Sequence, residues 1–373
     1  MDITQKLSLL GGLTPEQFMR RHWHKKPLLI RQAVALAQPL VSRSELFEMA
    51  ASEDVESRLI VQEGNGGWSL KRGPLPRRSL PPTTQPGWTV LVQGVDLHRD
   101  AAHDLLQQFR FVPDARVDDL MVSWASDGGG VGPHFDSYDV FLLQVQGRRR
   151  WRIGRLEDPQ LQPDVPLKIL QNFIAEEEFV LEPGDMLYLP PRWAHDGVAE
   201  GECMTASIGF RAPARTELAR EIMVRMLEAV EAEGDSPLYR DPRQPATETP
   251  GAIPEGLADY ARDALQALLR DEASLQCALG EYLSEPKPQV WFEVGDAADL
   301  SGGVRLDRRS RMMYDERHVF FNGESYRAGG RDAKLMRVLA DSRCLDARQV
   351  SQLSEGAREL LERWGDDGWL HPA

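Results

Sequence analysis

Residues Gly128–Trp151 decide how the rest of this sequence is interpreted; they are GGGVGPHFDSYDVFLLQVQGRRRW. The first half contains His134-Phe-Asp136, just ahead of an apolar run that predicts a strand. In a strand, the side chains at i and i+2 share a face, so we expect His134 and Asp136 to point the same way. The glycines before them allow tight backbone paths that larger residues would resist.

A second histidine, His195, follows a Pro-Pro-Arg-Trp-Ala sequence further along the chain. Two imidazoles and one carboxylate are the ligand set of non-haem Fe(II) oxygenases, which leaves metal positions open for a co-substrate and O2. A His-x-Asp pair by itself is a weak pattern, but the other six histidines lack a comparable context. We therefore predict a metal site made by His134, Asp136 and His195.

The arginine-rich run after this strand indicates a co-substrate. We expect a hairpin turn at Gln146-Gly147, followed by a returning strand on which Arg149, Trp151 and Ile153 share one face. Because that face is the bulkier and more apolar one, it should point inward. A buried guanidinium needs an anionic partner, and a carboxylate suits its two-pronged geometry. The 5-carboxylate of 2-oxoglutarate fits; the alternative is that the whole run is a solvated basic edge strand.

Composition sets limits on the class of protein. The chain has 373 residues and a formal net charge of −14, so we expect two or three domains and little non-specific binding to nucleic acid. The three cysteines lie far apart in the sequence, which favours a reducing, cytoplasmic compartment. We see neither a signal peptide nor an apolar run long enough to span a membrane. The cysteines are Cys203, Cys277 and Cys344.

The first part of the chain combines helical and extended signals. Thr14, Pro15 and Gln17 predict the start of a helix that ends near Lys26. We also expect a strand at Leu28–Ile30 and a helix around residues 101–108. From Trp88 to Phe210, short apolar runs are separated by turn-forming residues, a pattern typical of a barrel or sandwich.

After Phe210 the pattern becomes helical. We predict one helix over residues 217–233 and another over 257–283. Their apolar stripes could form a core of their own or an interface between subunits, and of the two we expect a dimer interface. From Gln289 onward the chain resembles a small mixed domain. Asn322-Gly323 favours a type I′ hairpin there, and helices should follow around residues 333–340, 347–352 and 355–364.

Together these motifs resemble those of the bacterial ribosomal oxygenases of the JmjC/cupin type, which hydroxylate an arginine of large-subunit ribosomal protein sixteen. The resemblance spans nearly the whole chain and includes the opening His22-Trp-His-Lys-Lys-Pro motif. The other matching segments are residues 128–141, 147–152, 182–191, 195–197 and 207–213.

The resemblance implies an α+β fold. Residues 1–212 would hold N-terminal helical elements and a double-stranded β-helix (cupin/JmjC) barrel, with its core at about 88–212. Residues 213–286 would form a helical dimerisation region and residues 287–373 a winged-helix-like domain. The resemblance also implies a homodimer that acts on a large-subunit ribosomal protein, with no direct contact to nucleic acid or membrane.

The resemblance implies a role for each site residue. Fe(II) would be bound by His134, Asp136 and His195, while Arg149 would hold 2-oxoglutarate, the co-substrate used with O2. Ser207 could add a hydroxyl contact to that co-substrate. Asp127 could pair with a substrate guanidinium.

Other functions remain open at this level. Related human enzymes of this type act on histidine, so a histidyl hydroxylase is one alternative. A cupin barrel joined to a winged-helix-like domain could instead be a ligand-sensing transcription regulator, although the interleaved charges of the C-terminal part do not favour it. A metal-binding isomerase or storage-type barrel is a third alternative, but it assigns no role to Arg149.

Overall fold

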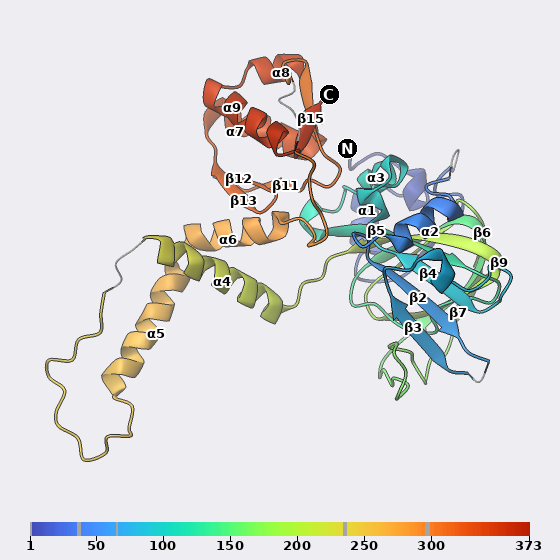
Figure 1. Cartoon of the computed structure of the whole chain (residues 1–373), viewed down its shortest axis with the longest axis horizontal. Coiled ribbons are helices and arrows are strands. Elements are labelled where there is room, and N and C mark those ends of the chain that lie inside the picture. The colour runs from blue at the N-terminus through green and yellow to red at the C-terminus, as the bar shows by residue number, and fades with distance from the viewer. Residues whose placement is uncertain (1, 36–38, 65, 234–236, 295–298) are drawn as a thin grey trace. The chain divides into compact units, whose positions relative to one another are not determined.

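The computed structural model describes residues 2–35, 39–64, 66–233, 237–294 and 299–373. The chain divides into two compact units, Met1–Ala212 and Pro213–Ala373. Figure 1 shows a sheet-rich unit coloured blue to yellow-green and a second unit coloured olive to red. The further division of the second unit near residue 286 stays a prediction.

The first unit is built on one antiparallel nine-stranded sheet, ordered β1-β8-β6-β9-β5-β4-β2-β3, with β7 also paired to β6. The two longest strands, β6 and β9, pair from Val140↔Gly209 to Arg155↔Trp193. The strands are β1 (Leu28–Ile30), β2 (Ser57–Gln62), β3 (Trp68–Arg72), β4 (Trp88–Val92), β5 (Val117–Ala125), β6 (Val140–Arg155), β7 (Glu177–Leu181), β8 (Met186–Leu189) and β9 (Trp193–Phe210).

The predicted hairpin turn at Gln146-Gly147 is wrong, because β6 continues through it. Gly147 has φ 63° and lies where the register between β6 and β9 shifts. A β-carbon on Gly147 would lie 2.2 Å from the carbonyl oxygen of Glu202. A glycine at positive φ serves a β-bulge as well as a turn, and the sequence does not distinguish the two.

The bulge determines which residues of β6 share a face. Before it, Val140 and Leu142 belong to the same buried apolar cluster as Trp151 and Ile153 after it. The inward face thus changes from even-numbered to odd-numbered residues, as one inserted residue requires. Phe141 faces the other way, into a second core shared with the N-terminal helices.

The N-terminal elements cover that second core. Thr14 and Gln17 form the predicted capping box of α1 (Pro15–Arg21), and Phe18 is fully buried. The helix ends at Arg21 and not near Lys26, because the chain turns away through His24, which has φ 56°. The other helical elements of this unit are η1 (Ser8–Leu10), α2 (Arg43–Ala51), η2 (Arg77–Ser79), η3 (Val95–Leu97), α3 (Asp100–Gln107) and η4 (Asp114–Arg116).

The second unit opens with α4 (Arg215–Glu233), α5 (Glu255–Arg270) and α6 (Glu272–Ser284). The prediction of one helix over 257–283 is wrong, since Asp271, with ψ 85°, separates α5 from α6 and accepts a hydrogen bond from the Ser274 backbone N–H. No described helix is long and apolar enough to cross a membrane.

The remainder of the second unit packs around Phe321, Leu339 and Trp364. The hairpin at Asn322-Gly323 is confirmed: φ is 50° and 92°, and β12 pairs antiparallel with β13. The elements are β10 (Gly303–Leu306), β11 (Met312–Tyr314), β12 (His318–Phe321), β13 (Glu324–Arg327), α7 (Gly330–Ser342), β14 (Cys344–Asp346), α8 (Ala347–Ser351), α9 (Glu355–Asp366) and β15 (Leu370–Pro372).

Candidate metal centre

His134 and His195 are brought together by their backbones. Each donates its N–H to the other's carbonyl oxygen, at 3.0 Å and 2.8 Å, and the ring centroids lie 4.2 Å apart. The glycine run leads to this bridge along β9, where the Ala199 N–H donates to the Gly129 carbonyl at 2.9 Å. A β-carbon on Gly130 would lie 2.5 Å from the Gly197 carbonyl oxygen, so this close approach requires glycine.

Asp136 joins the two histidines, but not by the strand geometry predicted for it. β6 begins only at Val140, so His134 and Asp136 lie on an irregular segment and the argument from a shared strand face is wrong. The Asp136 carbonyl instead accepts a hydrogen bond of 2.9 Å from the Arg192 N–H. Its carboxylate oxygen Oδ2 lies 3.7 Å from His195 Nε2.

The three side chains are arranged as a metal site requires. One ligand atom from each of His134, Asp136 and His195 lies within 4.8 Å of the others; among the described residues this is the one such group. Nδ1 of His134 faces the Gly132 carbonyl at 2.9 Å, and Nδ1 of His195 faces the Trp193 carbonyl at 3.0 Å. Each carbonyl can accept a hydrogen bond from Nδ1–H, and in that tautomer Nε2 keeps its lone pair for a ligand.

His195 is also held in the neutral form. Its side chain is buried, and burial, followed by the nearby His134, lowers the pKa of His195 to about 4. A neutral imidazole is the form that binds a metal ion. The donor set of two imidazoles and one carboxylate suits a non-haem iron centre with open positions.

Arg149 lies inside the sheet, as its alternation predicts. The residue is 3% exposed; Nη1 donates to Ser123 Oγ at 3.2 Å and to Thr205 Oγ1 at 3.3 Å. Nη2 donates to the Gly197 carbonyl at 3.3 Å. Nε is buried without a partner, and within the described residues Arg149 forms no salt bridge. A buried guanidinium whose protein partners are all uncharged is suited to bind an anionic ligand.

The alternative of a solvated basic edge strand is wrong, because β6 is central in the sheet. The neighbouring arginines do face outward, where each meets a carboxylate. Arg150 contacts Glu178 and Glu200, Arg152 contacts Asp196, and Arg148 lies 3.4 Å from Glu200.

Ser207 and Asp127 are the two remaining residues predicted for the site. Ser207 is buried on β9 and has the same strand parity as Thr205, opposite Leu142 of β6. Asp127 is exposed, and its Oδ1 accepts a hydrogen bond of 2.8 Å from the Gly201 N–H. That contact supports the backbone of β9. The co-substrate role of Ser207 and the substrate role of Asp127 stay predictions.

Sequence reasoning missed Ser123 and Thr205, the two hydroxyl residues that contact Arg149. The sequence offered one signal for Thr205, which alternates with the apolar Met204 and Ala206 of the core on the other face of the sheet. Ser123 gave none, because its proximity depends on the pairing of β5 with β9, where it lies opposite Thr205.

Comparisons with known proteins agree with this geometry. Residues 104–218 match the JmjC domain family, and residues 267–371 match the ROXA-like winged helix. The chain is 35% identical to the ribosomal protein uL16 3-hydroxylase of Escherichia coli, over 91% of each chain. It is 29% identical to a probable ribosomal oxygenase of Haemophilus influenzae, over 96% of each.

Solved structures give the same result. An X-ray structure of E. coli YcfD aligns with a TM-score of 0.81 at 29% identity, covering 96% of this chain and 98% of that one. A structure of YcfD, described as a ribosomal oxygenase, holds cobalt and 2-oxoglutarate and aligns with a TM-score of 0.78 at the same identity and coverage. The predicted α+β fold of a JmjC/cupin domain with a winged helix is confirmed. This chain belongs to the bacterial JmjC ribosomal oxygenase family.

Proposed function

We propose that this chain is an Fe(II)- and 2-oxoglutarate-dependent oxygenase that hydroxylates the β-carbon of an arginine in a large-subunit ribosomal protein of the uL16 type. The observation that carries the proposal is the unpaired, buried Arg149 in the same sheet interior as His134, Asp136 and His195. The relative of known activity is a uL16 3-hydroxylase.

The chain's donors fit iron. Two imidazole nitrogens and one carboxylate oxygen leave positions for a chelating oxoacid and O2. When bound, iron with 2-oxoglutarate and O2 supplies the oxidant: one oxygen atom enters the substrate C–H bond and the other enters succinate, with loss of CO2. The protein residues bind and orient these groups and keep water from them.

Arg149 would hold the distal carboxylate of 2-oxoglutarate. Its Nε is free to donate, and its guanidinium lies 5.2 Å from the Trp151 ring, which limits its orientation. A carboxylate in this place would pair a buried cation that otherwise has only hydroxyl and carbonyl partners. Ser207 would add a hydroxyl donor. Asp127 would pair with the substrate guanidinium through the carboxylate oxygen that Gly201 leaves free.

We also propose a homodimer through α4 and α5. Both helices expose apolar side chains on the described surface: Met223, Val224, Leu227, Leu257, Tyr260, Leu265 and Leu269. Such a stripe is costly in water and typical of a protein interface. The bacterial relative and the three free cysteines support a cytoplasmic location.

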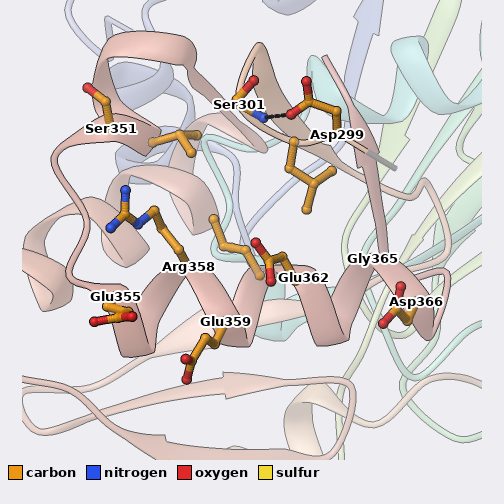
Figure 2. Close-up of a pocket in the computed structure, with 12 residues that line it drawn as sticks. Asp299, Ser301, Ser351, Glu355, Arg358, Glu359, Glu362, Gly365 and Asp366 are labelled. Carbon is orange, nitrogen blue, oxygen red and sulfur yellow. Dashed lines mark hydrogen bonds between the residues drawn. The ribbon is translucent and has the colours of Figure 1, made fainter. Parts of the chain in front are cut away.

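The second unit favours a protein partner over nucleic acid. A hollow of about 780 Å³ lies in this unit. Its lining includes Asp299, Glu355, Glu359, Glu362 and Asp366 together with Arg358, which Figure 2 labels. Carboxylates repel the phosphate backbone on which DNA binding depends, which speaks against a transcription regulator. The overall charge of −14 suits a basic ribosomal protein.

The test is a hydroxylation assay on isolated large-subunit ribosomal proteins with Fe(II), 2-oxoglutarate and O2, read by mass spectrometry. We expect one protein of the uL16 type to gain one oxygen atom on an arginine, with one succinate formed per oxygen gained. Oxygen on a histidine would favour the histidyl hydroxylase. No gain in any ribosomal protein, with the metal and 2-oxoglutarate bound, would contradict the proposed substrate class.

A further inference from the structure

The His22-Trp-His motif near the N-terminus has no part in the proposed chemistry, yet it is held tightly against the sheet. The Trp23 ring stacks on Tyr188, with centroids 6.2 Å apart, and meets Phe210 edge-on at 5.0 Å. His24 follows in the left-handed region at φ 56°, a conformation uncommon for a residue with a β-carbon. This conformation places both its backbone N–H and its ring beside one carboxylate.

That carboxylate is Asp139, which is fully buried between Asp136 and the start of β6. Its Oδ1 accepts hydrogen bonds from the Tyr188 hydroxyl at 2.5 Å and the His24 N–H at 3.3 Å. Its Oδ2 lies 3.0 Å from His24 Nε2 and 3.9 Å from Arg116 Nη2. Burial raises the pKa of Asp139, and these partners oppose that rise.

The contacts of Asp139 fix one end of the segment that carries Asp136. The other end is fixed by the backbone bridge between His134 and His195. Asp139 is also held by its backbone, because its carbonyl accepts the Phe210 N–H at 3.2 Å. Between these two anchors, the Asp136 backbone has one hydrogen bond, from Arg192. The position of the Asp136 carboxylate therefore depends on both anchors.

We propose that Asp139 is a positioning residue: held by His24, Tyr188 and Arg116, it fixes the segment that presents Asp136 and so sets the affinity of the metal centre. The N-terminal motif thus supports the metal site from the opposite face of the sheet. The inference rests on the proposed metal-binding role of His134, Asp136 and His195.

The test uses the full chain with the substitutions Asp139→Asn, His24→Ala and His24→Gln. Each variant is titrated with Mn(II) and with Co(II), recording the dissociation constant and the visible spectrum of the cobalt form. Loss of a residue that orients a metal ligand lowers metal affinity by about 10–100-fold. We expect that loss, with a changed cobalt spectrum, for Asp139→Asn and His24→Ala. His24→Gln offers Asp139 an amide N–H donor of similar reach and should restore most of the affinity.

The chain offers a matched control in its second unit. Asp307 is also buried, with the His371 Nε2 at 2.9 Å and the Arg309 Nε at 2.8 Å. Asp307→Asn should lower the unfolding temperature and leave metal affinity and the cobalt spectrum unchanged.

The proposal is overturned if Asp139→Asn lowers the unfolding temperature as Asp307→Asn does, while metal affinity and spectrum stay at the wild-type values. If Asp139→Asn does not fold, the His24 pair decides, because that side chain is 45% exposed; equal affinity of His24→Ala and the wild type then overturns it. If the wild type itself binds neither metal, the proposed metal site fails together with this inference.

Discussion

Arginines lie on both faces of β6, and their partners differ between the two faces. On the outward face, Arg150 and Arg152 meet carboxylates and are about half exposed. On the inward face, Arg149 is buried and meets two hydroxyls, a carbonyl oxygen and an indole ring. Adjacent arginines on one strand therefore differ in whether the protein provides their counter-charge.

That difference separates a structural ion pair from a binding site. An exposed pair contributes about 0–1 kcal/mol, because water screens it. A buried cation without a counter-charge is destabilising by several kcal/mol. The presence of such an arginine in the folded chain therefore favours a ligand that supplies the negative charge. We expect changes on the inward face to alter turnover and binding, and changes on the outward face to alter stability slightly.

The largest effect is expected at the metal ligands. His134→Ala or Asp136→Ala should reduce substrate-dependent succinate formation by more than about a hundredfold, since even residues that only orient ligands cost 10–100-fold. The measurement is succinate release with metal content determined on the same sample. Arg150→Ala serves as the outward control and should keep full activity. Undiminished turnover in a ligand variant that retains stoichiometric metal would show that the ligand assignment is wrong.

The next effect concerns Arg149. Arg149→Lys should raise the KM for 2-oxoglutarate by about 10–100-fold, because one or two charge-assisted hydrogen bonds worth about 1.5–3 kcal/mol are lost. Arg150→Lys should leave that KM unchanged. Steady-state kinetics at saturating protein substrate distinguish the two. Equal KM values for both variants would show that Arg149 contributes no more than Arg150 to the binding of 2-oxoglutarate.

A third effect is the pH dependence of stability in the metal-free chain. The folded-state pKa of His195 is about 4, whereas in the unfolded chain it is about 6.5. The unfolded state therefore binds more protons between these values, so the stability is fully present above about pH 6.5 and falls as pH drops toward 4, by about 3 kcal/mol. Urea unfolding at pH 7 and pH 5 measures the first part of this loss, about 2 kcal/mol. His195→Gln should flatten the profile, and an unflattened one would assign the loss to other groups.

The smallest effect is expected on the outward face. Arg150→Ala should lower the free energy of unfolding by less than about 1 kcal/mol, and added salt should reduce the difference. Denaturant unfolding at low and high ionic strength tests this. A loss of several kcal/mol would mean that the outward pairs are as critical as the inward site.

The site was more predictable than the path of the chain through it. Alternation along the arginine run indicated that Arg149 faces inward, because a period of two is a local property of any strand. The bulge at Gly147 was predicted as a turn, because glycine suits a bulge and a turn equally. Either conformation places Arg149 on the inward face. The contacts of Arg149 with Ser123 and Thr205 could not be predicted, because they depend on which distant strands pair.

The same holds for other elements: those set by neighbouring residues were predicted, and those set by contacts with distant residues were not. The capping box at Thr14 and the turn at Asn322-Gly323 are local signals, and both were predicted. The end of α1 was not, because His24 leaves the helix to reach Asp139, a residue far along the chain. The break at Asp271 was missed because the apolar stripe continues across it.

Direct binding of 2-oxoglutarate tests the central claim best. The Mn(II)-loaded chain is titrated by calorimetry with 2-oxoglutarate and with a 2-oxo monoacid of equal length that lacks the distal carboxylate. We expect the wild type and Arg150→Ala to prefer 2-oxoglutarate by at least about tenfold, equivalent to about 1.4 kcal/mol, and Arg149→Ala to show no preference. A preference that persists in Arg149→Ala would mean that Arg149 does not bind the distal carboxylate.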